Sequence, residues 1–218
     1  MNMINHHAAA PCLLTNAATP AMQESYNRIR VNLLARAGLG SERGTGTVCP
    51  VIGVTSVVRH RSRRYLAANL AISFARLGMR VLLVDADYRS EGLAPLLEVA
   101  EGGGIAARAA GREAAPVQAL LPTLHVLGRG LLEGNPADFV GSTAFFAAIE
   151  GLRDGYDAIF ISLPPVTAYA DAATAAPALS GMVLGVTPGH DRRQSVTEAV
   201  NTLQSVGVPL YGMVACEE

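Results

Sequence analysis

Short apolar runs alternate with helical patterns along most of this chain, from residue 51 to residue 214. Each run is apolar almost throughout rather than at every second position, as in strands that are covered on both faces of a parallel sheet. The runs lie at residues 51–56, 80–84, 124–127, 158–162, 182–187 and 210–214. Strands that alternate with helices are joined by right-handed crossovers. The sequence therefore predicts an α/β fold with a doubly wound, mostly parallel sheet flanked by helices.

The chain is expected to form a single domain, residues 19–218, after a flexible N-terminal tail, residues 1–18, of small and polar side chains. Thr19 and Pro20 predict the start of a first helix, because a hydroxyl caps the helix end and proline suits the first helical position. Further helices are predicted through residues 66–77 and at about 142–153, 170–177 and 192–205. The glycine-rich segment 102–104 is predicted to be a surface turn.

All 17 basic residues of the chain are arginines, against 18 acidic residues, which gives a formal net charge of −1. The absence of lysine excludes a Schiff base, a lysine nucleophile and a lysine that binds nucleotide phosphates. The balanced charge argues against a nucleic-acid-binding domain. Three separated cysteines and five scattered histidines give no metal-binding pattern, so no metal site is expected. Prolines and glycine interrupt the longest uncharged segment, and the start of the chain does not resemble a signal peptide, so a soluble, cytoplasmic protein is expected.

Several short motifs follow one another in a specific order along the chain. They lie at residues 24–30, 32–34, 54–56, 67–71, 81–87, 89, 135–136, 155–161, 164–165, 171–172 and 206–214. Together they resemble the cytoplasmic domain of the bacterial tyrosine kinases that work beside membrane polysaccharide co-polymerases in capsule and exopolysaccharide assembly. The resemblance covers almost the whole chain. It implies a P-loop NTPase-like, Rossmann-type fold with three layers.

The chain departs from this family where the phosphate chemistry is expected. After its first strand the family carries a loop of the form Gly-x-Gly-Lys-Ser/Thr, and an alignment without gaps places there His60, Arg61, Ser62, Arg63 and Arg64. Both glycines are lost, although glycine lets successive backbone N–H groups turn toward phosphates. Arg63 holds the lysine position, Arg64 the position of the magnesium-binding hydroxyl, and Ser162 the Walker B position, where the family has aspartate. The terminal tyrosine cluster of active relatives is also absent.

These departures predict a catalytically inactive tyrosine-kinase-like protein that needs no cofactor and acts as an adaptor or regulator in exopolysaccharide or capsule biosynthesis and export. The resemblance implies that Asp85 and Asp87 would hold magnesium or activate the attacking hydroxyl in an active relative, so here they are vestigial. One alternative is an active tyrosine autokinase that binds ATP and magnesium with Arg63 in place of the lysine. A second is a partition-type module that binds polyanions.

Two further segments are candidates for interaction. The first helix is similar to the family's oligomerisation motif, which makes Glu24, Arg28 and Arg30 candidate contacts, although Asn27 stands where the family has arginine. The resemblance implies a membrane co-polymerase or another exopolysaccharide-assembly protein as partner, at the periphery of the inner membrane, and leaves a homo-oligomer open. Residues 59–64 include four arginines beside a predicted helix start. They form either a site for an anion or acidic partner or a solvated loop, and nucleic acid is unlikely because no aromatic-rich surface accompanies them.

Overall fold

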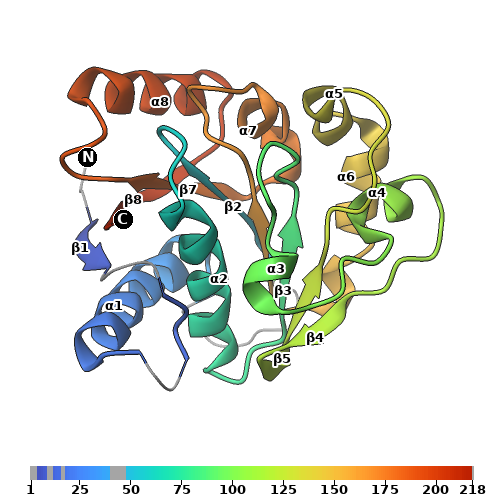
Figure 1. Cartoon of the computed structure of the whole chain (residues 1–218), viewed down its shortest axis with the longest axis horizontal. Helices are drawn as coiled ribbons and strands as arrows, with labels where there is room; N and C mark the ends of the chain where they lie inside the picture. Colours follow the sequence, from blue (N-terminus) through green and yellow to red (C-terminus); the bar gives the residue numbers. More distant parts are fainter. Residues whose placement is uncertain (1–3, 9–11, 16–17, 40–47, 218) are drawn as a thin grey trace.

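One sheet organises the molecule. The computed structural model describes residues 4–8, 12–15, 18–39 and 48–217, and in this part of the chain eight strands pair in the order β1-β8-β7-β2-β6-β3-β5-β4. All neighbouring strands run parallel except β4 and β5. The strands are β1 Ile4–Ala8, β2 Val51–Ser56, β3 Val81–Asp85, β4 Val117–Ala119, β5 Leu121–Leu127, β6 Ala158–Ser162, β7 Gly181–Val186 and β8 Leu210–Cys216. The predicted doubly wound, mostly parallel sheet is confirmed (Figure 1).

Helices cover both faces of this sheet. They are α1 Pro20–Arg36, α2 Ser62–Ala75, α3 Ala94–Leu97, α4 Gly104–Ala109, α5 Pro136–Val140, α6 Thr143–Glu150, α7 Asp171–Thr174 and α8 Arg193–Ser205, with short 3-10 turns at Arg153–Gly155 and Ala176–Ala178. One buried apolar cluster joins α1 and α2 to the sheet. A second cluster joins α4, α6, α7 and α8 to the opposite face. The result is the expected three-layer arrangement of helices, sheet and helices.

The two clusters explain why the strand runs are apolar throughout. In β3, Val81 and Leu83 belong to the α1–α2 cluster, whereas Leu82 and Val84 belong to the cluster on the other face. Successive side chains of a strand point to opposite faces, so a strand with helices on both sides needs apolar residues at every position. Asp85 follows Val81 and Leu83 in this alternation and therefore lies on the face that α2 covers.

Five described elements, β1, β4, α3, α4 and α5, were not among the predicted ones. The expected surface turn at 102–104 holds only for its first two residues, because Gly104 is buried and begins α4. Gly104 has a φ of +60°, and a Cβ there would lie 2.3 Å from the backbone nitrogen of Gly130. Only glycine allows α4 to approach the β5–α5 connection this closely.

The described residues of segment 1–18, for which a tail was expected, contact the domain. The Leu14 side chain is 2% exposed and belongs to the α1–α2 cluster. Its backbone N–H donates to Asn69 Oδ1 at 2.6 Å, and Asn69 Nδ2 donates to the carbonyl of Cys12 at 2.8 Å. β1 adds a parallel strand to β8 at the edge of the sheet. Residues 1–3, 9–11 and 16–17 lie outside the described part.

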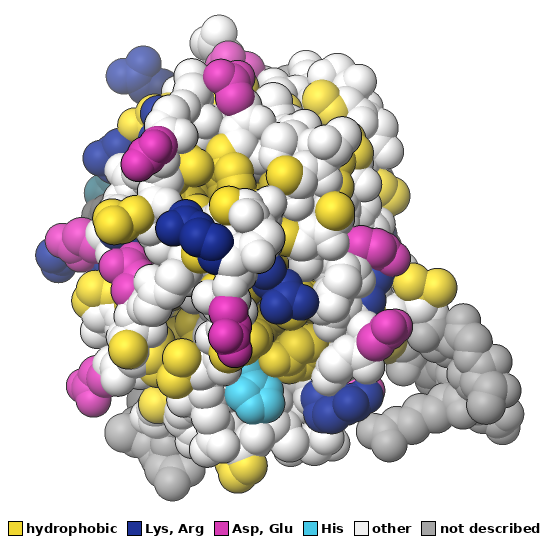
Figure 2. Space-filling model, turned by 90° about the vertical axis from the view of Figure 1, so that its right-hand side faces the viewer, with side chains coloured by type: hydrophobic (Ala, Val, Ile, Leu, Met, Phe, Trp, Pro, Cys, Tyr) yellow, Lys and Arg dark blue, Asp and Glu magenta, His cyan; other side chains and the backbone are white. Residues whose placement is uncertain are grey.

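The surface over α4, α5 and α6 mixes charges of both signs. Figure 2 looks at this side of the molecule and shows arginine and acidic side chains scattered among apolar and uncharged ones. Interspersed charges of this kind are typical of an ordinary solvated surface. Among the described helices, none has the length and apolar character needed to cross a membrane.

Candidate functional site

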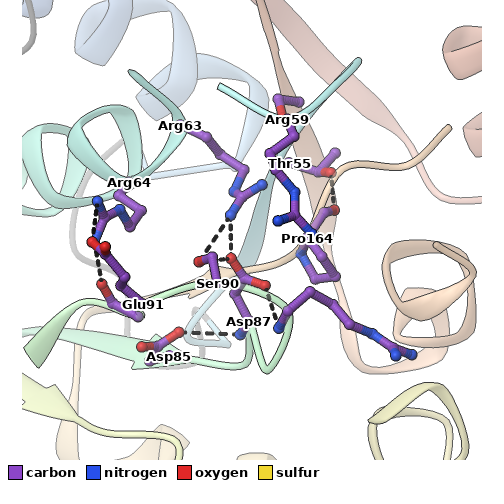
Figure 3. Close-up of polar contacts among 12 residues, drawn as sticks. Thr55, Arg59, Arg63, Arg64, Asp85, Asp87, Ser90, Glu91 and Pro164 are labelled. Atoms are coloured by element: carbon purple, nitrogen blue, oxygen red, sulfur yellow. Dashed lines mark hydrogen bonds and ion pairs between the residues drawn. The ribbon is translucent and has the colours of Figure 1, made fainter. Parts of the chain in front are cut away.

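The carboxyl ends of β2, β3 and β6 meet at one edge of the sheet and bring the predicted site residues together (Figure 3). Residues 57–61 connect β2 to α2, and residues 86–93 connect β3 to α3. Because neighbouring parallel strands end at the same edge, these two connections face each other across the start of α2. Ligands of doubly wound folds bind in the crevice outside such strand ends.

The 57–61 connection has an ordinary backbone. None of its residues, all of which the structure describes, has a positive φ. Anion-binding nests need successive N–H groups in alternating right- and left-handed conformations, so this connection forms no such nest. Val57 N–H donates to the carbonyl of Gly185, and His60 Nε2 lies 3.5 Å from Asp191 Oδ1. These contacts fasten the connection to β7 and to the segment between β7 and α8.

Arg63, the second residue of α2, points into the site and is only 2% exposed. Its Nη2 forms an ion pair with the carboxylate of Asp87, which is 1% exposed, and lies 3.4 Å from Ser90 Oγ. Burial lowers the pKa of Arg63, and the carboxylates of Asp87 and Asp85 oppose this effect. The lysine position is thus occupied by a cation that already has an anionic partner within the chain.

Asp85 closes the turn that follows β3. Its Oδ1 accepts the backbone N–H of Asp87 at 3.1 Å, and its Oδ2 accepts that of Leu93 at 2.7 Å. Burial raises the pKa of Asp85 to about 6, although the two backbone hydrogen bonds act in the opposite direction. Both oxygens of Asp85 therefore serve the local backbone, as a retained strand-end turn requires.

Arg129 is a site residue that the sequence analysis missed. It lies just after β5, and its Nη1 donates to the carbonyls of Asp87 and Ser90. Its Nε pairs with Glu101 at 2.8 Å. A lone arginine between two glycines gives no recognisable pattern, and only the parallel pairing of β3 with β5 brings it to this turn.

A second group of missed contacts surrounds Tyr169, in the connection between β6 and α7. Arg89 lies over the Tyr169 ring at 4.8 Å and pairs with the fully buried Asp171 at 3.2 Å. Arg59 Nη2 donates to the Tyr169 hydroxyl at 2.6 Å. Arg89 and Asp171 stand in recognised motifs, but their mutual contact was not predicted.

The remaining residues of the predicted loop have separate environments. Arg64 pairs with Glu91 at 3.0 Å and donates to the carbonyl of Gly92. The Arg61 side chain is exposed and has no hydrogen-bond or ion-pair partner among the described residues, while its carbonyl accepts the N–H of Arg64. Ser62 is buried at the first position of α2. Ser162, at the Walker B position, is fully buried, and its Oγ has no hydrogen-bond partner in the described part of the chain.

The three candidate interaction residues lie on α1, apart from this site. Arg28 and Glu24 are exposed and pair with each other at 2.9 Å within the helix. Arg30 is partly buried, and its Nη1 donates to the carbonyl of Ser73 near the C-terminal end of α2. Arg30 therefore fastens α1 to α2, whereas the other two side chains face solvent.

The described residues contain no group of three or more histidine, cysteine, aspartate or glutamate side chains placed to hold a metal ion. The site instead consists of buried ion pairs between arginines and aspartates around the first turn of α2. Such pairs are stable only when both partners are present, because removing one leaves an uncompensated buried charge.

Comparisons with known proteins agree with this architecture. The chain is 26% identical over 197 residues to the tyrosine-protein kinase CpsD of Streptococcus agalactiae, covering 88% of this chain and 82% of that protein. It is 31% identical over 156 residues to the putative tyrosine-protein kinase EpsB of Ralstonia solanacearum, covering 70% of this chain but only 21% of EpsB. No protein-family model matches the chain.

Solved structures give the same result for the fold. The BceF tyrosine kinase domain superposes with a TM-score of 0.76 at 25% identity and covers 90% of this chain and 78% of that domain. The chimerical protein CapA2B2 superposes with a TM-score of 0.81 at 22% identity and covers 92% of this chain and 86% of that one. The relatives of this chain are bacterial tyrosine kinases, and its structural neighbours include their kinase domains.

Proposed function

Since this chain belongs to the bacterial tyrosine kinases, we propose that it is a catalytically inactive member that acts as an adaptor or regulator in exopolysaccharide or capsule biosynthesis and export. It would work in the cytoplasm, at the inner membrane through a partner. The resemblance supplies the pathway and the kind of partner. The site supplies the argument for inactivity.

The buried contact between Arg63 and Asp87 carries the proposal. In phosphoryl transfer a lysine ammonium binds the phosphates and a carboxylate holds magnesium. At the corresponding positions here, cation and carboxylate bind each other and are both almost inaccessible to solvent. A nucleotide would have to separate them, and breaking a buried pair costs about 3–5 kcal/mol. That cost disfavours nucleotide binding before any phosphate contact forms.

The other donors also fit a magnesium nucleotide poorly. Magnesium prefers carboxylate, hydroxyl and phosphate oxygens in octahedral geometry. Arg64 stands at the hydroxyl position and pairs with Glu91, while Ser162 replaces the Walker B carboxylate with a neutral group. Asp85 uses both carboxylate oxygens on backbone N–H groups. The residues present at this site therefore do not fit ATP with magnesium.

An adaptor needs surfaces that a partner can reach. Glu24 and Arg28 are exposed on α1 and form a surface ion pair with each other, and such pairs contribute little to stability. A partner or a second copy of the chain could replace that pair with contacts of its own at little cost. Arg30 is less suited to this role because its guanidinium already binds α2.

Incubation of the purified chain with Mg-ATP tests the proposal. We expect no phosphotyrosine, and no rise in melting temperature with Mg-ATP or Mg-ADP, because a ligand that binds the folded state stabilises it. An active relative such as CpsD serves as the positive control. Phosphotyrosine that forms on the wild-type chain and disappears in the Asp87→Asn variant would establish the active autokinase instead.

A further inference from the structure

We propose that the edge of β8 at residues 210–213 binds an extended peptide segment in which acidic side chains alternate with apolar ones. The segment would belong to a partner protein and would add a strand to the sheet. Leu210 begins β8, whereas the candidate site lies where the parallel strands end. The edge site therefore lies at the opposite end of the sheet and does not depend on whether the kinase site is active.

A hollow of about 410 Å³ lies at this end of β8. It is lined by Arg36 at the end of α1, by Gln204 near the end of α8 and by residues 207–213. Figure 1 shows α8 above and α1 below this part of the sheet. The strand edge thus lies between two helix ends, in a hollow whose size is typical of ligand-binding clefts.

The strand edge itself is the first observation. On one side, β8 pairs with β7 from Leu210 to Ala215. On the other side, β1 pairs only with Val214, Ala215 and Cys216. Within the described part of the chain, residues 210–213 therefore have no neighbouring strand on this side. Such an edge presents backbone N–H and C=O groups to which an extended peptide can add.

Arg36 gives the site its charge preference. Among the described residues that line the hollow, it is the only charged one. Its side chain is exposed and has no hydrogen-bond or ion-pair partner in the described part of the chain. A guanidinium binds a carboxylate through paired N–H groups. An acidic side chain on the added strand would therefore complement Arg36.

The other side of the strand edge is apolar. Leu210 and Met213 are partly buried and pack against the cluster on the α8 face, whereas Arg36 comes from α1 on the opposite face. Successive side chains of an added strand point to opposite faces of the sheet. Every second side chain would thus face Arg36, and those between would face Leu210 and Met213. This geometry favours acidic residues that alternate with apolar ones.

The wall of the hollow is held in place by the chain's own contacts. Tyr211 is 9% exposed, and its hydroxyl donates to the carbonyl of Ser180 at 2.8 Å. The backbone N–H of Met182 donates to the carbonyl of Pro209 at 2.8 Å. A preformed site has little conformational entropy to lose on binding, which favours affinity for a short segment.

Selection of octapeptides from a random display library on the immobilised full chain tests the proposal. We expect enriched peptides in which aspartate or glutamate alternates with apolar residues. Synthetic copies should bind Arg36→Glu about tenfold more weakly than the wild type, as expected for the loss of a charged hydrogen bond. Arg112→Glu is the matched control and should bind like the wild type, since Arg112 is also exposed and does not line the hollow. Because both side chains are exposed, the two variants keep the fold.

Pairing through the backbone is tested with the same peptides. Amides of an added strand point alternately toward β8 and away from it. N-methylation of one alternate set should therefore weaken binding strongly, and methylation of the other set should have a much smaller effect. Hydrogen exchange should show added protection at residues 210–213 in the wild type and none there in Arg36→Glu.

Four results would overturn the proposal. Two are no enrichment above a support without protein, and equal weakening in Arg36→Glu and Arg112→Glu. A dimer of the wild type that dissociates in Arg36→Glu would make a second copy of the chain the occupant. Binding that appears only after deletion of residues 1–3 would make that segment of the chain the occupant.

Discussion

At the scale of single residues, Arg63 decides the character of the site. A lysine ammonium is a compact charge on a flexible stem, whereas a guanidinium is planar and presents five donors in a fixed fork. Arg63 contacts Asp87 and Ser90 through Nη2, while its Nε and Nη1 are buried without a hydrogen-bond partner in the described part of the chain. The sequence analysis singled out Arg63 at the lysine position of the family's loop. It could not show that the arginine would turn toward Asp87, because that contact joins two connections of the sheet.

Replacement of Arg63 by methionine is predicted to destabilise the fold. The Asp87 carboxylate would remain buried without its counter-charge, so the free energy of unfolding should fall by about 3–5 kcal/mol. Arg61→Met, on the exposed neighbouring residue, should change it by no more than about 0.5 kcal/mol. Urea denaturation monitored by circular dichroism measures both values. Equal changes in the two variants would mean that the Arg63–Asp87 pair does not contribute to the free energy of unfolding.

Asp85 is predicted to make stability depend on pH. Its pKa is raised from 3.8 to about 6 in the folded state, so the folded chain binds this proton more tightly than the unfolded chain. The contribution is present below about pH 4 and is lost as the pH rises through about 6, a change on the order of 2–3 kcal/mol. The free energy of unfolding, measured between pH 4 and pH 7, should therefore fall less steeply with pH in the Asp85→Asn variant than in the wild type. If the free energy of unfolding depended on pH equally in the wild type and the variant, this contribution of Asp85 would be contradicted.

At the scale of elements, the sequence predicted those that follow from local pattern. The long helices and the continuous apolar strands carry periodicity and caps in their own residues, and their predicted bounds lie within a few residues of the observed ones. The missed elements are mostly short, and several are fixed by distant contacts. α4 begins at Gly104 because that glycine packs on Gly130, and β4 forms because it pairs with β5. The same contrast holds for the candidate site. The sequence analysis named its residues, but it did not predict the ion pairs between them.

The approach of α4 to the β5–α5 connection predicts a contrast between two glycines. Gly104 and Gly111 both have positive φ, so alanine at either costs about 1–2 kcal/mol. At Gly111 the new Cβ meets nothing within 4 Å, whereas at Gly104 it meets backbone at 2.3 Å. Gly104→Ala should therefore lose at least a further 1–3 kcal/mol. Thermal unfolding of both variants measures the difference, and similar melting temperatures would show that the contact can relax.

At the scale of the whole molecule, the sheet extends beyond the expected domain boundary. β1 and the residues around Leu14 come from a segment whose composition predicts a tail. A few apolar residues among small and polar ones do not form a recognisable periodicity. The burial of Leu14 is visible only once α1 and α2 provide the surface on which it packs.

Truncation of Leu14 to alanine measures how much this segment contributes to the stability of the domain. Leu14→Ala should lower the free energy of unfolding by about 2–5 kcal/mol, the usual range for a buried leucine. Leu131→Ala is the matched control, because Leu131 is 93% exposed and its truncation should have almost no effect. Chemical denaturation provides the comparison. If Leu14→Ala behaved like the control, residues 12–15 would be a removable tail.

The antiparallel strand β4 affects how readily copies of this protein aggregate through the edges of their sheets at high concentration. Without it, the seven residues of β5 would present unpaired backbone groups that could template edge-to-edge aggregation. β4 covers part of that edge with three residues. Pro116 precedes it, and proline has no N–H to offer a neighbouring chain. This side of the sheet therefore ends in a short strand that is a poor template for amyloid-like growth.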